Sequence, residues 1–523
     1  MSEAKQNQQT HEVREHSHKE ILTIMAGLMT GILLAALDQT VVSTALKSIV
    51  EDFDGLNHYT WVVTAYLLTS TAVTPLYGKV SDIYGRRPVY IFSIVTFLIG
   101  SFLAGAATDM TQLIAFRAVQ GIGAGGLFAL SFIIIGDIVS PRNRGKYQGL
   151  FGAVWGLSSV AGPLLGGFFA EQSEIFGVTG WRWIFYINVP FGIIALVVTA
   201  LVLHIPKTHA KKSIDYLGAL FMVIAVTSLL LATSVTGPAD GWLHPFTLAY
   251  FACALLFTAL FIWREGRAPD PLLPLRLFSN HTFSLTSLIA FITGAGMFGA
   301  IVLLPLYMQV NLLYTPNEAG IRLIPMMLGI VAMAITSGRL ISSTGKYKRF
   351  PVAGMVVMMV AMLLFTTINK EMPYWQLAIY AMLMGMGVGL SMQTVVIALQ
   401  NDVDYKDMGI ATSSNTFFRS LGASFGTAIF GTILTNNFIA SAKASLPAGT
   451  SPDAIAGVTQ NTALINTLPP SIQEVIFKSF DSAFSDVFWI ALPIIAIGFI
   501  LTTRLRERPL RETIGSGSSE VAG

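Results

Sequence analysis

Fourteen apolar runs, each about 20 residues long, dominate this 523-residue chain and restrict it to a helical membrane fold. A bilayer-spanning helix needs about 20 apolar residues and satisfies its backbone hydrogen bonds internally. Only 12% of the residues are charged, about half the share found in soluble domains. We therefore predict an all-α membrane protein with spans at 21–46, 58–77, 88–107, 111–137, 147–170, 181–204, 214–234, 246–263, 282–310, 319–341, 350–368, 373–400, 409–436 and 484–503.

The basic residues predict the orientation of the spans. With both termini in the cytoplasm, 24 of the 32 Lys and Arg residues fall in inner segments and six in outer segments. Because cytoplasmic loops carry the excess of basic residues, this bias favours an even number of helices in the cytoplasmic (inner) membrane. The net charge of +3 is too small to indicate nucleic-acid binding, and the single cysteine, Cys253, excludes a disulfide framework.

Glycines that recur at a constant interval indicate a duplicated half. Six glycines between positions 121 and 167 recur 264 residues later, and GKVSDIYGRR (78–87) is echoed by GRLISSTGKY (338–347). Internal repeats mark transporters whose binding site lies between the halves. The predicted organisation is a polar cytoplasmic tail (1–20) without a signal peptide, a six-helix bundle (21–204), a linker with two extra helices (205–281), a second six-helix bundle (282–503) with an extracytoplasmic loop (437–482), and a cytoplasmic tail (504–523).

Asp38 is a carboxylate deep inside the first apolar run. An ionised side chain there costs at least about 3 kcal/mol, so such residues usually face a cavity and carry a function. A buried acid that gains and loses a proton is a natural proton carrier. Arg117, in the fourth run, is expected at a similar depth from the helical rise, so a direct or water-mediated pair with Asp38 is possible. A purely structural ion pair is the alternative.

Two further motifs predict moving parts. The loop GKVSDIYGRR has the spacing of a conformational gate, although its arginines could merely anchor the topology. The gate residues are Gly78, Asp82, Gly85, Arg86 and Arg87, with Asp137 as an acid that the arginines could face. Within the fifth run, GPLLGG places Pro163 among Gly162, Gly166 and Gly167, which predicts a kinked helix with close packing, either a hinge or a simple kink.

Three residues are candidates for contact with a substrate or its pathway. Arg419 lies near mid-depth with no carboxylate in its own helix, so it contacts either substrate or the carbonyls of a neighbouring helix. Trp155 is its counterpart in the repeat, and Glu318 lies at an outer helix mouth, where solvation is the alternative. We expect no metal site, because a polar tail explains His11, His16 and His18 better.

We also expect no cofactor. GIGAGG (121–126) satisfies G-x-G-x-x-G, but it lies in an apolar helix with no preceding strand, which is the wrong context for dinucleotide binding. No Walker-type phosphate loop is present in the sequence, which argues against ATP hydrolysis by this chain.

Together these motifs resemble the major facilitator superfamily, in particular the fourteen-helix drug:proton antiporters typified by EmrB and QacA. LDQTVVSTAL (37–46) is similar to the helix-1 signature, and GKVSDIYGRR to the motif of loop 2–3. RAVQGIGAGG (117–126) resembles the helix-4 motif, GPLLGG the antiporter motif, and WRWIFYINVPFG (181–192) is typical of the fourteen-helix group. The sequence departs from these patterns at Ser43, Lys47, Val80, Ile83 and Ser158.

The resemblance implies the major facilitator fold, with two six-helix bundles and two extra central helices. It also implies proton-driven export of lipophilic, often cationic, drugs or toxic compounds by a monomer, with Asp38 and Arg117 in proton coupling. A dedicated exporter of a lipid, siderophore, amino acid or other metabolite is an alternative on the same fold. A sensor or an intramembrane enzyme is disfavoured, because the apolar runs contain no nucleophile or metal constellation.

Overall fold

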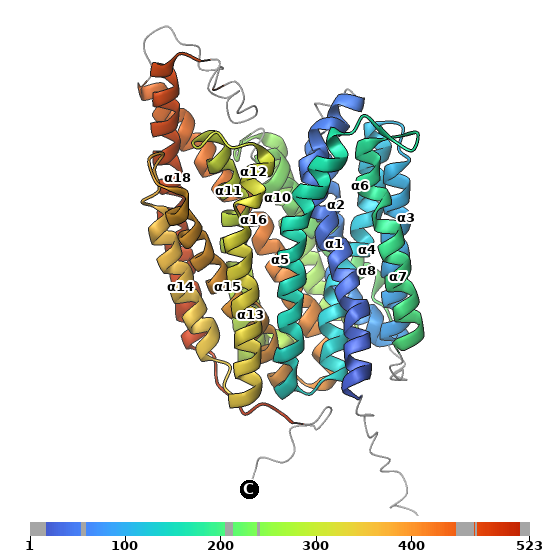
Figure 1. Cartoon of the computed structure of the whole chain (residues 1–523). Coiled ribbons are helices and arrows are strands. Elements are labelled where there is room, and N and C mark those ends of the chain that lie inside the picture. Colours follow the sequence, from blue (N-terminus) through green and yellow to red (C-terminus); the bar gives the residue numbers. More distant parts are fainter. Residues whose placement is uncertain are drawn as a thin grey trace, which may run out of the picture.

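Two bundles of long helices lie side by side in the structure, a computed structural model that describes residues 17–53, 59–203, 213–237, 241–445, 465 and 468–512 (Figure 1). The first bundle contains α1 (His18–Phe53), α2 (Tyr59–Tyr84), α3 (Arg86–Gly105), α4 (Met110–Ile138), α5 (Pro141–Glu171), α6 (Trp183–Tyr186) and α7 (Asn188–Val202). The second contains α11 (His281–Val310), α12 (Pro316–Ile321), α13 (Ile324–Thr344), α14 (Arg349–Phe365), α15 (Tyr374–Asp402), α16 (Met408–Ser445) and α18 (Pro470–Thr503).

Short elements connect these helices. A two-stranded antiparallel hairpin, β1 (Glu174–Ile175) and β2 (Val178–Thr179), follows α5, and the 3₁₀ turn η2 (Gly180–Arg182) leads into α6. The 3₁₀ turns η4 (Leu275–Ser279) and η5 (Tyr405–Asp407) precede α11 and α16. We call the end of the bundles where the described chain begins and ends the base; it is the lower end in Figure 1.

Twelve helices of the described chain are long and apolar enough to span a membrane. The helices α2, which is interrupted by Ser and Thr residues, and α14, which has 17 residues, are not among the twelve. Both nevertheless lie within the bundles, α2 against α4 and α14 against α15. The protein is therefore an all-helical, multi-pass membrane protein, while the expected number of fourteen spans stays a prediction.

Repeated glycines make equivalent contacts in the two bundles. Gly121 of α4 lies against the backbone of Tyr66 on α2, and Gly385 of α15 lies in the same way against Met326 on α13. A side chain at either position would collide with the facing helix, so glycine allows the close approach. The repeated sequence pattern therefore corresponds to a repeated packing pattern.

The two bundles touch closely at the base. A Cβ at Gly145 of α5 would lie 2.6 Å from the carbonyl oxygen of Gly338 on α13. Similarly, a Cβ at Gly78 of α2 would lie 2.7 Å from the carbonyl oxygen of Gly409 on α16. The packing of α5 against α13 and of α2 against α16 thus closes the base in this structure.

Residues 505–512, which we call the C-terminal strap, cross this seam. The strap follows α18 and hydrogen bonds to the second bundle: Tyr347 Oη donates to the carbonyl oxygen of Arg506 at 2.9 Å, and Asn401 Nδ2 to that of Pro509 at 3.1 Å. At its end, Glu512 forms an ion pair with Arg142, the second residue of α5 in the first bundle. The strap therefore connects the two bundles at the base.

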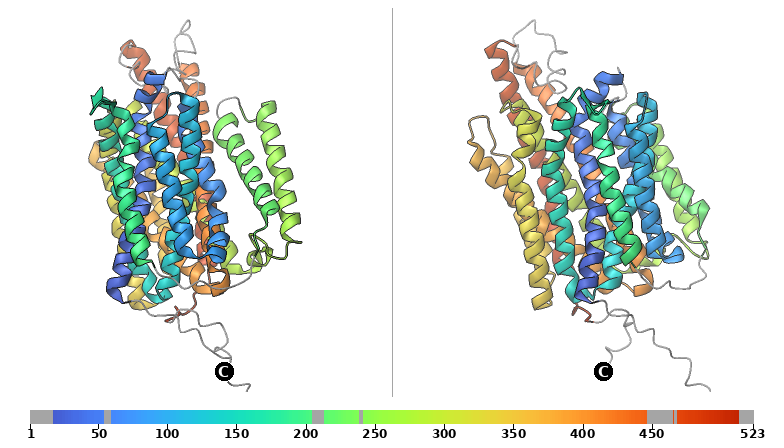
Figure 2. Two further views of the ribbon diagram at one scale, coloured as in Figure 1. Left: turned by 90° about the vertical axis from the view of Figure 1, so that its right-hand side faces the viewer. Right: turned by 45° about the vertical axis from the view of Figure 1, so that its right-hand side comes forward.

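The linker between the bundles forms a helical hairpin. It consists of α8 (Tyr216–Leu231), which ends in the π-helical turn η3 (Ala232–Thr236), and α10 (Pro245–Glu265). Arg264 Nε donates to Asp215 at 2.9 Å and joins the two helices. The hairpin stands at the side of the bundles, where α8 contacts α2 and η3 contacts α16 (Figure 2). It therefore lies beside the bundles and contributes no residue to the Asp38 cluster described below.

The helices on either side of the expected loop 437–482 are longer than the sequence suggested. Helix α16 continues to Ser445 and α18 begins at Pro470, so the ends of that range are helical. The first part of α18, before the last apolar run, packs aromatic side chains inward: Phe480 contacts the rings of Tyr307 and Phe438. Burial of those rings therefore continues the helix beyond the apolar run. Residues 446–464 and 466–467 lie outside the described chain.

Candidate functional site

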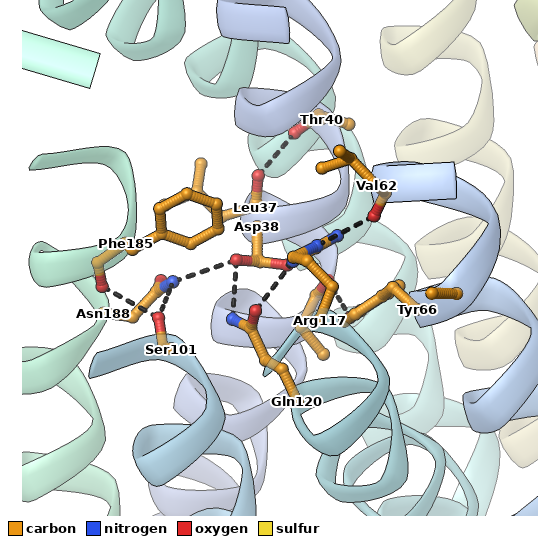
Figure 3. Close-up of polar contacts among 12 residues, drawn as sticks. Leu37, Asp38, Thr40, Val62, Tyr66, Ser101, Arg117, Gln120, Phe185 and Asn188 are labelled. Carbon is orange, nitrogen blue, oxygen red and sulfur yellow. Dashed lines mark hydrogen bonds and ion pairs between the residues drawn. The ribbon is translucent and has the colours of Figure 1, made fainter. Parts of the chain in front are cut away.

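Asp38 lies in a closed polar cluster inside the first bundle (Figure 3). Its Oδ2 accepts a hydrogen bond from Arg117 Nη1 at 2.5 Å, and its Oδ1 accepts from Gln120 Nε2 at 2.7 Å and from Asn188 Nδ2 at 3.1 Å. Each of these four residues is at most 1% exposed. Three helices, α1, α4 and α7, thus surround one carboxylate that is sealed from solvent.

Arg117 makes two further hydrogen bonds and a cation–π contact within the first bundle. Its Nε donates to the carbonyl oxygen of Val62 at 3.1 Å, and its Nη1 also donates to Gln120 Oε1 at 2.7 Å. The guanidinium carbon lies 4.3 Å from the centroid of the Tyr66 ring, within the range of a cation–π contact. Because the charge stays paired even where it is buried, the pair satisfies the condition under which buried ions are tolerated.

The structure brings together the two residues selected from the sequence and adds three that the sequence analysis missed. Gln120 stands one turn after Arg117 on α4, and Asn188 begins α7 within WRWIFYINVPFG. Tyr66 Oη donates to the carbonyl oxygen of Ala35, one turn before Asp38. A polar residue in an apolar run was the available signal, and for Gln120 the spacing of three residues from Arg117 could have revealed it.

The antiporter-like motif of α5 packs directly against the turn that follows Asp38. Thr40 Oγ1 donates to the carbonyl oxygen of Ser158 at 3.0 Å, and Gly162 lies against the Thr40 side chain. One turn higher, a Cβ at Gly166 would lie 2.6 Å from the carbonyl oxygen of Val41, whereas a Cβ at Gly167 would meet nothing within 4 Å. Gly162 and Gly166 therefore face α1, and Gly167 does not.

Pro163 faces the second bundle. A Cβ at Gly320 of α12 would lie 3.0 Å from its side chain. The helix α5 thus contacts α1 of its own bundle near Asp38 and also α12 and α13 of the other bundle.

The predicted gate residues meet at the base. Arg86 bridges two carboxylates, with its Nη1 2.5 Å from Asp82 Oδ1 and its Nε 2.6 Å from Asp137 Oδ2. Gly85 has a φ of 95°, which favours glycine at the sharp turn between α2 and α3. A Cβ at Gly409 of α16 would lie 2.6 Å from Asp82 Oδ1, so this ion-pair network borders the second bundle. Arg87 turns instead to the carbonyl oxygen of Ala200 on α7.

The three candidate pathway residues have different surroundings. Trp155 of α5 meets Phe298 of α11 edge to face, with 5.7 Å between ring centroids. Arg419 of α16 points to Phe132 of α4, at 5.5 Å from the ring centroid. Both therefore reach across the seam between the bundles. Glu318 is exposed and serves as a helix cap, because its Oε2 accepts hydrogen bonds from the backbone and the hydroxyl of Thr315 at 2.9 and 3.1 Å.

No metal-binding cluster is present among the described residues. His11 and His16 lie outside the described chain, and His18 Nδ1 lies 2.8 Å from the hydroxyl of Tyr147.

Comparison with known families agrees with this architecture. The family model described as Major Facilitator Superfamily matches residues 28–427, more than three quarters of the chain. The chain belongs to the Major Facilitator Superfamily. It is accordingly a transporter rather than an enzyme.

Members of the superfamily with curated names align over nearly the whole chain. The multidrug transporter protein MdtP of Bacillus subtilis is 36% identical over 521 residues, which cover 94% of each chain. An uncharacterized MFS-type transporter of Mycobacterium tuberculosis is 37% identical over 489 residues, which cover 94% of this chain and 70% of the relative. Among solved structures, the proton:xylose symporter XylE is similar in fold, with a TM-score of 0.59 at 13% identity over 92% of this chain and 96% of XylE.

Proposed function

We propose that this transporter is a proton-driven antiporter that exports lipophilic drugs or other toxic compounds across the cytoplasmic membrane. The observation that carries the proposal is the sealed Asp38 carboxylate, held by Arg117 and next to the helix α5 that also contacts the other bundle. Bacillus subtilis relatives named as a multidrug transporter and a multidrug resistance protein, 36% and 33% identical, support drugs as cargo.

In this proposal, Asp38 takes up a proton on Oδ2 and thereby loses the negative charge that binds Arg117. The guanidinium keeps the carbonyl oxygen of Val62 and the Gln120 amide as partners, so it can shift without losing every hydrogen bond. Because Thr40 ties this turn of α1 to α5, the rearrangement would change how α5 packs between the bundles. The proton-motive force suffices as a source of energy, since each charge that crosses 100 mV supplies about 2.3 kcal/mol.

We further propose that this protein has fourteen spans and belongs to the EmrB/QacA-like group of drug:proton antiporters. Both termini are cytoplasmic in this arrangement, which puts the base on the cytoplasmic side, and the monomer is the functional unit. The fourfold excess of Lys and Arg in inner segments supports this orientation. The packing of α2 and α14 within the six-helix bundles supports counting both as spans, in addition to the twelve helices that include α8 and α10 of the linker.

The test uses purified protein in proteoliposomes with an imposed pH gradient. Lumenal pH and the movement of a panel of fluorescent lipophilic dyes are followed together for the wild type and for Asp38→Asn, which keeps the size of the side chain and removes the titrating group. We expect coupled fluxes of protons and at least one dye in the wild type and neither in the variant. Asp52→Asn serves as the control, because Asp52 is a carboxylate of the same helix that is 37% exposed and contacts Arg182 and Trp181 rather than Arg117.

Proton-coupled export that persists in Asp38→Asn would refute the assignment of the coupling site. If one metabolite and none of the dyes drives a proton flux, the result would favour the alternative function, a dedicated exporter of that metabolite.

A further inference from the structure

Two polar side chains of the second bundle, separate from Asp38, face the seam between the bundles and carry buried atoms without hydrogen-bond partners among the described residues. Gln393 of α15 is 1% exposed, and neither its Nε2 nor its Oε1 has a hydrogen-bond partner among the described residues. Arg419 Nη1 is likewise buried and unpartnered in this part of the chain. Buried polar atoms are nearly always paired, so these three atoms point to a group that completes them.

The two side chains lie at a similar depth and reach neighbouring helices of the first bundle, Gln393 reaching α5 and Arg419 reaching α4. Gln393, Arg419 and Gly152 each stand about ten residues, roughly 15 Å, from the base end of their helices. A Cβ at Gly152 would lie 3.0 Å from Gln393 Nε2, so this amide rests directly on α5. Gln393 and Arg419 thus both come from the second bundle and face the first.

Two aromatic rings lie between Arg419 and the turn of α5 on which Gln393 rests. Arg419 lies over the ring of Phe132, and that ring packs edge to face on Phe151, the neighbour of Gly152, with 5.0 Å between centroids. Trp155 follows Gly152 by three residues, which puts it on the same face of α5. A ligand that reaches Arg419 and Gln393 would therefore also meet aromatic surfaces.

The positive charge of Arg419 determines which charge a ligand should carry. No carboxylate of the described residues lies within ion-pair distance of Arg419, and Asp38 is already committed to Arg117. An anionic group of a ligand could accept from Arg419 Nη1, and a polar group on the same ligand could pair with the amide of Gln393. A cation would instead face an uncompensated guanidinium, which disfavours its binding.

We infer that the transported compounds are amphipathic organic anions with an aromatic body, bound through Arg419 and Gln393. The inference rests on the proposed export function and narrows its cargo. It departs from the cationic drugs that the sequence resemblance implies.

The test compares two dyes that share the xanthene ring system but differ in charge, the carboxylate fluorescein and a rhodamine ester. Binding to purified protein is measured by fluorescence anisotropy, and transport by the proteoliposome assay under a pH gradient. We expect the wild type to bind and move fluorescein in preference to the rhodamine. Arg419→Gln should weaken fluorescein binding about tenfold to a hundredfold, the range for loss of a charge-assisted hydrogen bond.

Three variants make the result specific. Gln393→Leu, which keeps a similar volume, should weaken fluorescein binding less than Arg419→Gln does, and Arg419→Lys should retain part of it. Arg339→Gln removes an exposed arginine of α13 and should change nothing. A monodisperse elution profile and an unchanged thermal midpoint establish that each variant is folded.

The outcomes separate this inference from the proposed function. Proton-coupled movement of the rhodamine but not of fluorescein, or fluorescein binding that is unaffected in Arg419→Gln, would overturn the anion site and leave the antiporter intact. Fluorescein binding that depends on Arg419, without any proton-coupled flux, would overturn the antiporter and leave the anion site standing.

Discussion

Arg117 and Asp38 form an ion pair of 2.5 Å between Nη1 and Oδ2, and each side chain exposes at most 1% of its surface. Within the described part of the chain, the other carboxylate oxygen, Oδ1, accepts only from the neutral amides of Gln120 and Asn188. The two oxygens therefore differ: a proton on Oδ2 would compete directly with the Arg117 cation, whereas a proton on Oδ1 would compete with the two amides. In the proposed mechanism, Arg117 is therefore the group whose position would respond to the charge of Asp38.

Removal of Arg117 should destabilise the protein strongly. Arg117→Leu leaves Asp38 buried without its cation, a change that costs about 3–5 kcal/mol in comparable pairs. The thermal midpoint of the solubilised protein measures the loss. The double variant Asp38→Asn with Arg117→Leu should recover most of the stability, because no unpaired charge remains, but it should not recover proton coupling. A single variant as stable as the wild type would show that the pair is not sealed.

Close packing of α5 on α1 should depend on Gly162. Its substitution by Val puts a Cβ 2.5 Å from Thr40 Cβ, and such overpacking costs about 1–3 kcal/mol. We expect a lower thermal midpoint and reduced dye export for Gly162→Val. Gly167→Val is the matched control, because its Cβ would meet nothing within 4 Å. Equal effects of the two substitutions would contradict the role of this helix contact.

The ion pairs of Arg86 should hold the base closed. Asp137→Asn removes a charge-assisted hydrogen bond, which contributes about 1.5–3 kcal/mol, so the open base should become roughly ten times more populated or more. To report opening, Ser342→Cys is introduced in a Cys253→Ala background, so that it supplies the single thiol. Ser342 lies near the base end of α13 and is only 6% exposed, so a thiol there should react with reagents in solution mainly when the base opens. Its labelling by a water-soluble reagent should accelerate in Asp137→Asn. Asp404→Asn is the control, because the carboxylate of Asp404 and its partner Lys406 are both exposed.

Tyr347 should stabilise the C-terminal strap. Its hydroxyl donates to the carbonyl oxygen of Arg506 and accepts from the backbone N–H of Arg508, so Tyr347→Phe should cost about 1–3 kcal/mol. Burial raises the pKa of the Tyr347 hydroxyl above its usual value of 10.0. The hydroxyl proton is therefore held more tightly in the folded state. The contribution of Tyr347 to the free energy of unfolding should be complete below about pH 10 and should decline above it.

The thermal midpoints of wild type and Tyr347→Phe across this pH range measure the effect. Tyr216→Phe is the control, because the side chain of Tyr216 is 74% exposed. A difference that grows with pH above 10 would contradict the sign of the predicted dependence.

Positions of the long helices could be predicted from the sequence, because an apolar run has only one stable form in a bilayer. Their ends could not. The last helix begins at Pro470, about 14 residues before the apolar run predicted to span from 484, since Phe480 finds aromatic partners on other helices. Such partners are distant in sequence, and hydropathy alone does not reveal them.

Among the buried polar residues, the charged ones could be predicted from the sequence and the uncharged ones could not. Asp38 and Arg117 could be selected because an ion in an apolar run demands an explanation. Gln120, Asn188 and Gln393 are uncharged, and a single amide in a helix is compatible with either packing or function. Only the three-dimensional arrangement distinguishes Gln120, which is fully engaged with Asp38 and Arg117, from Gln393, whose amide has no partner among the described residues.

The backbone contact between Gly145 and Gly338 offers a way to trap the opposite conformation. A methyl group at Gly145 would lie 2.6 Å from the facing carbonyl oxygen, and rigid backbone rather than a flexible side chain stands in its way. An alanine there acts as a wedge in the closed base but occupies free space once α5 and α13 separate. The population of molecules should therefore shift toward the form that is open at the base. One added carbon atom could thus provide a second structure of the transport cycle without any bound inhibitor.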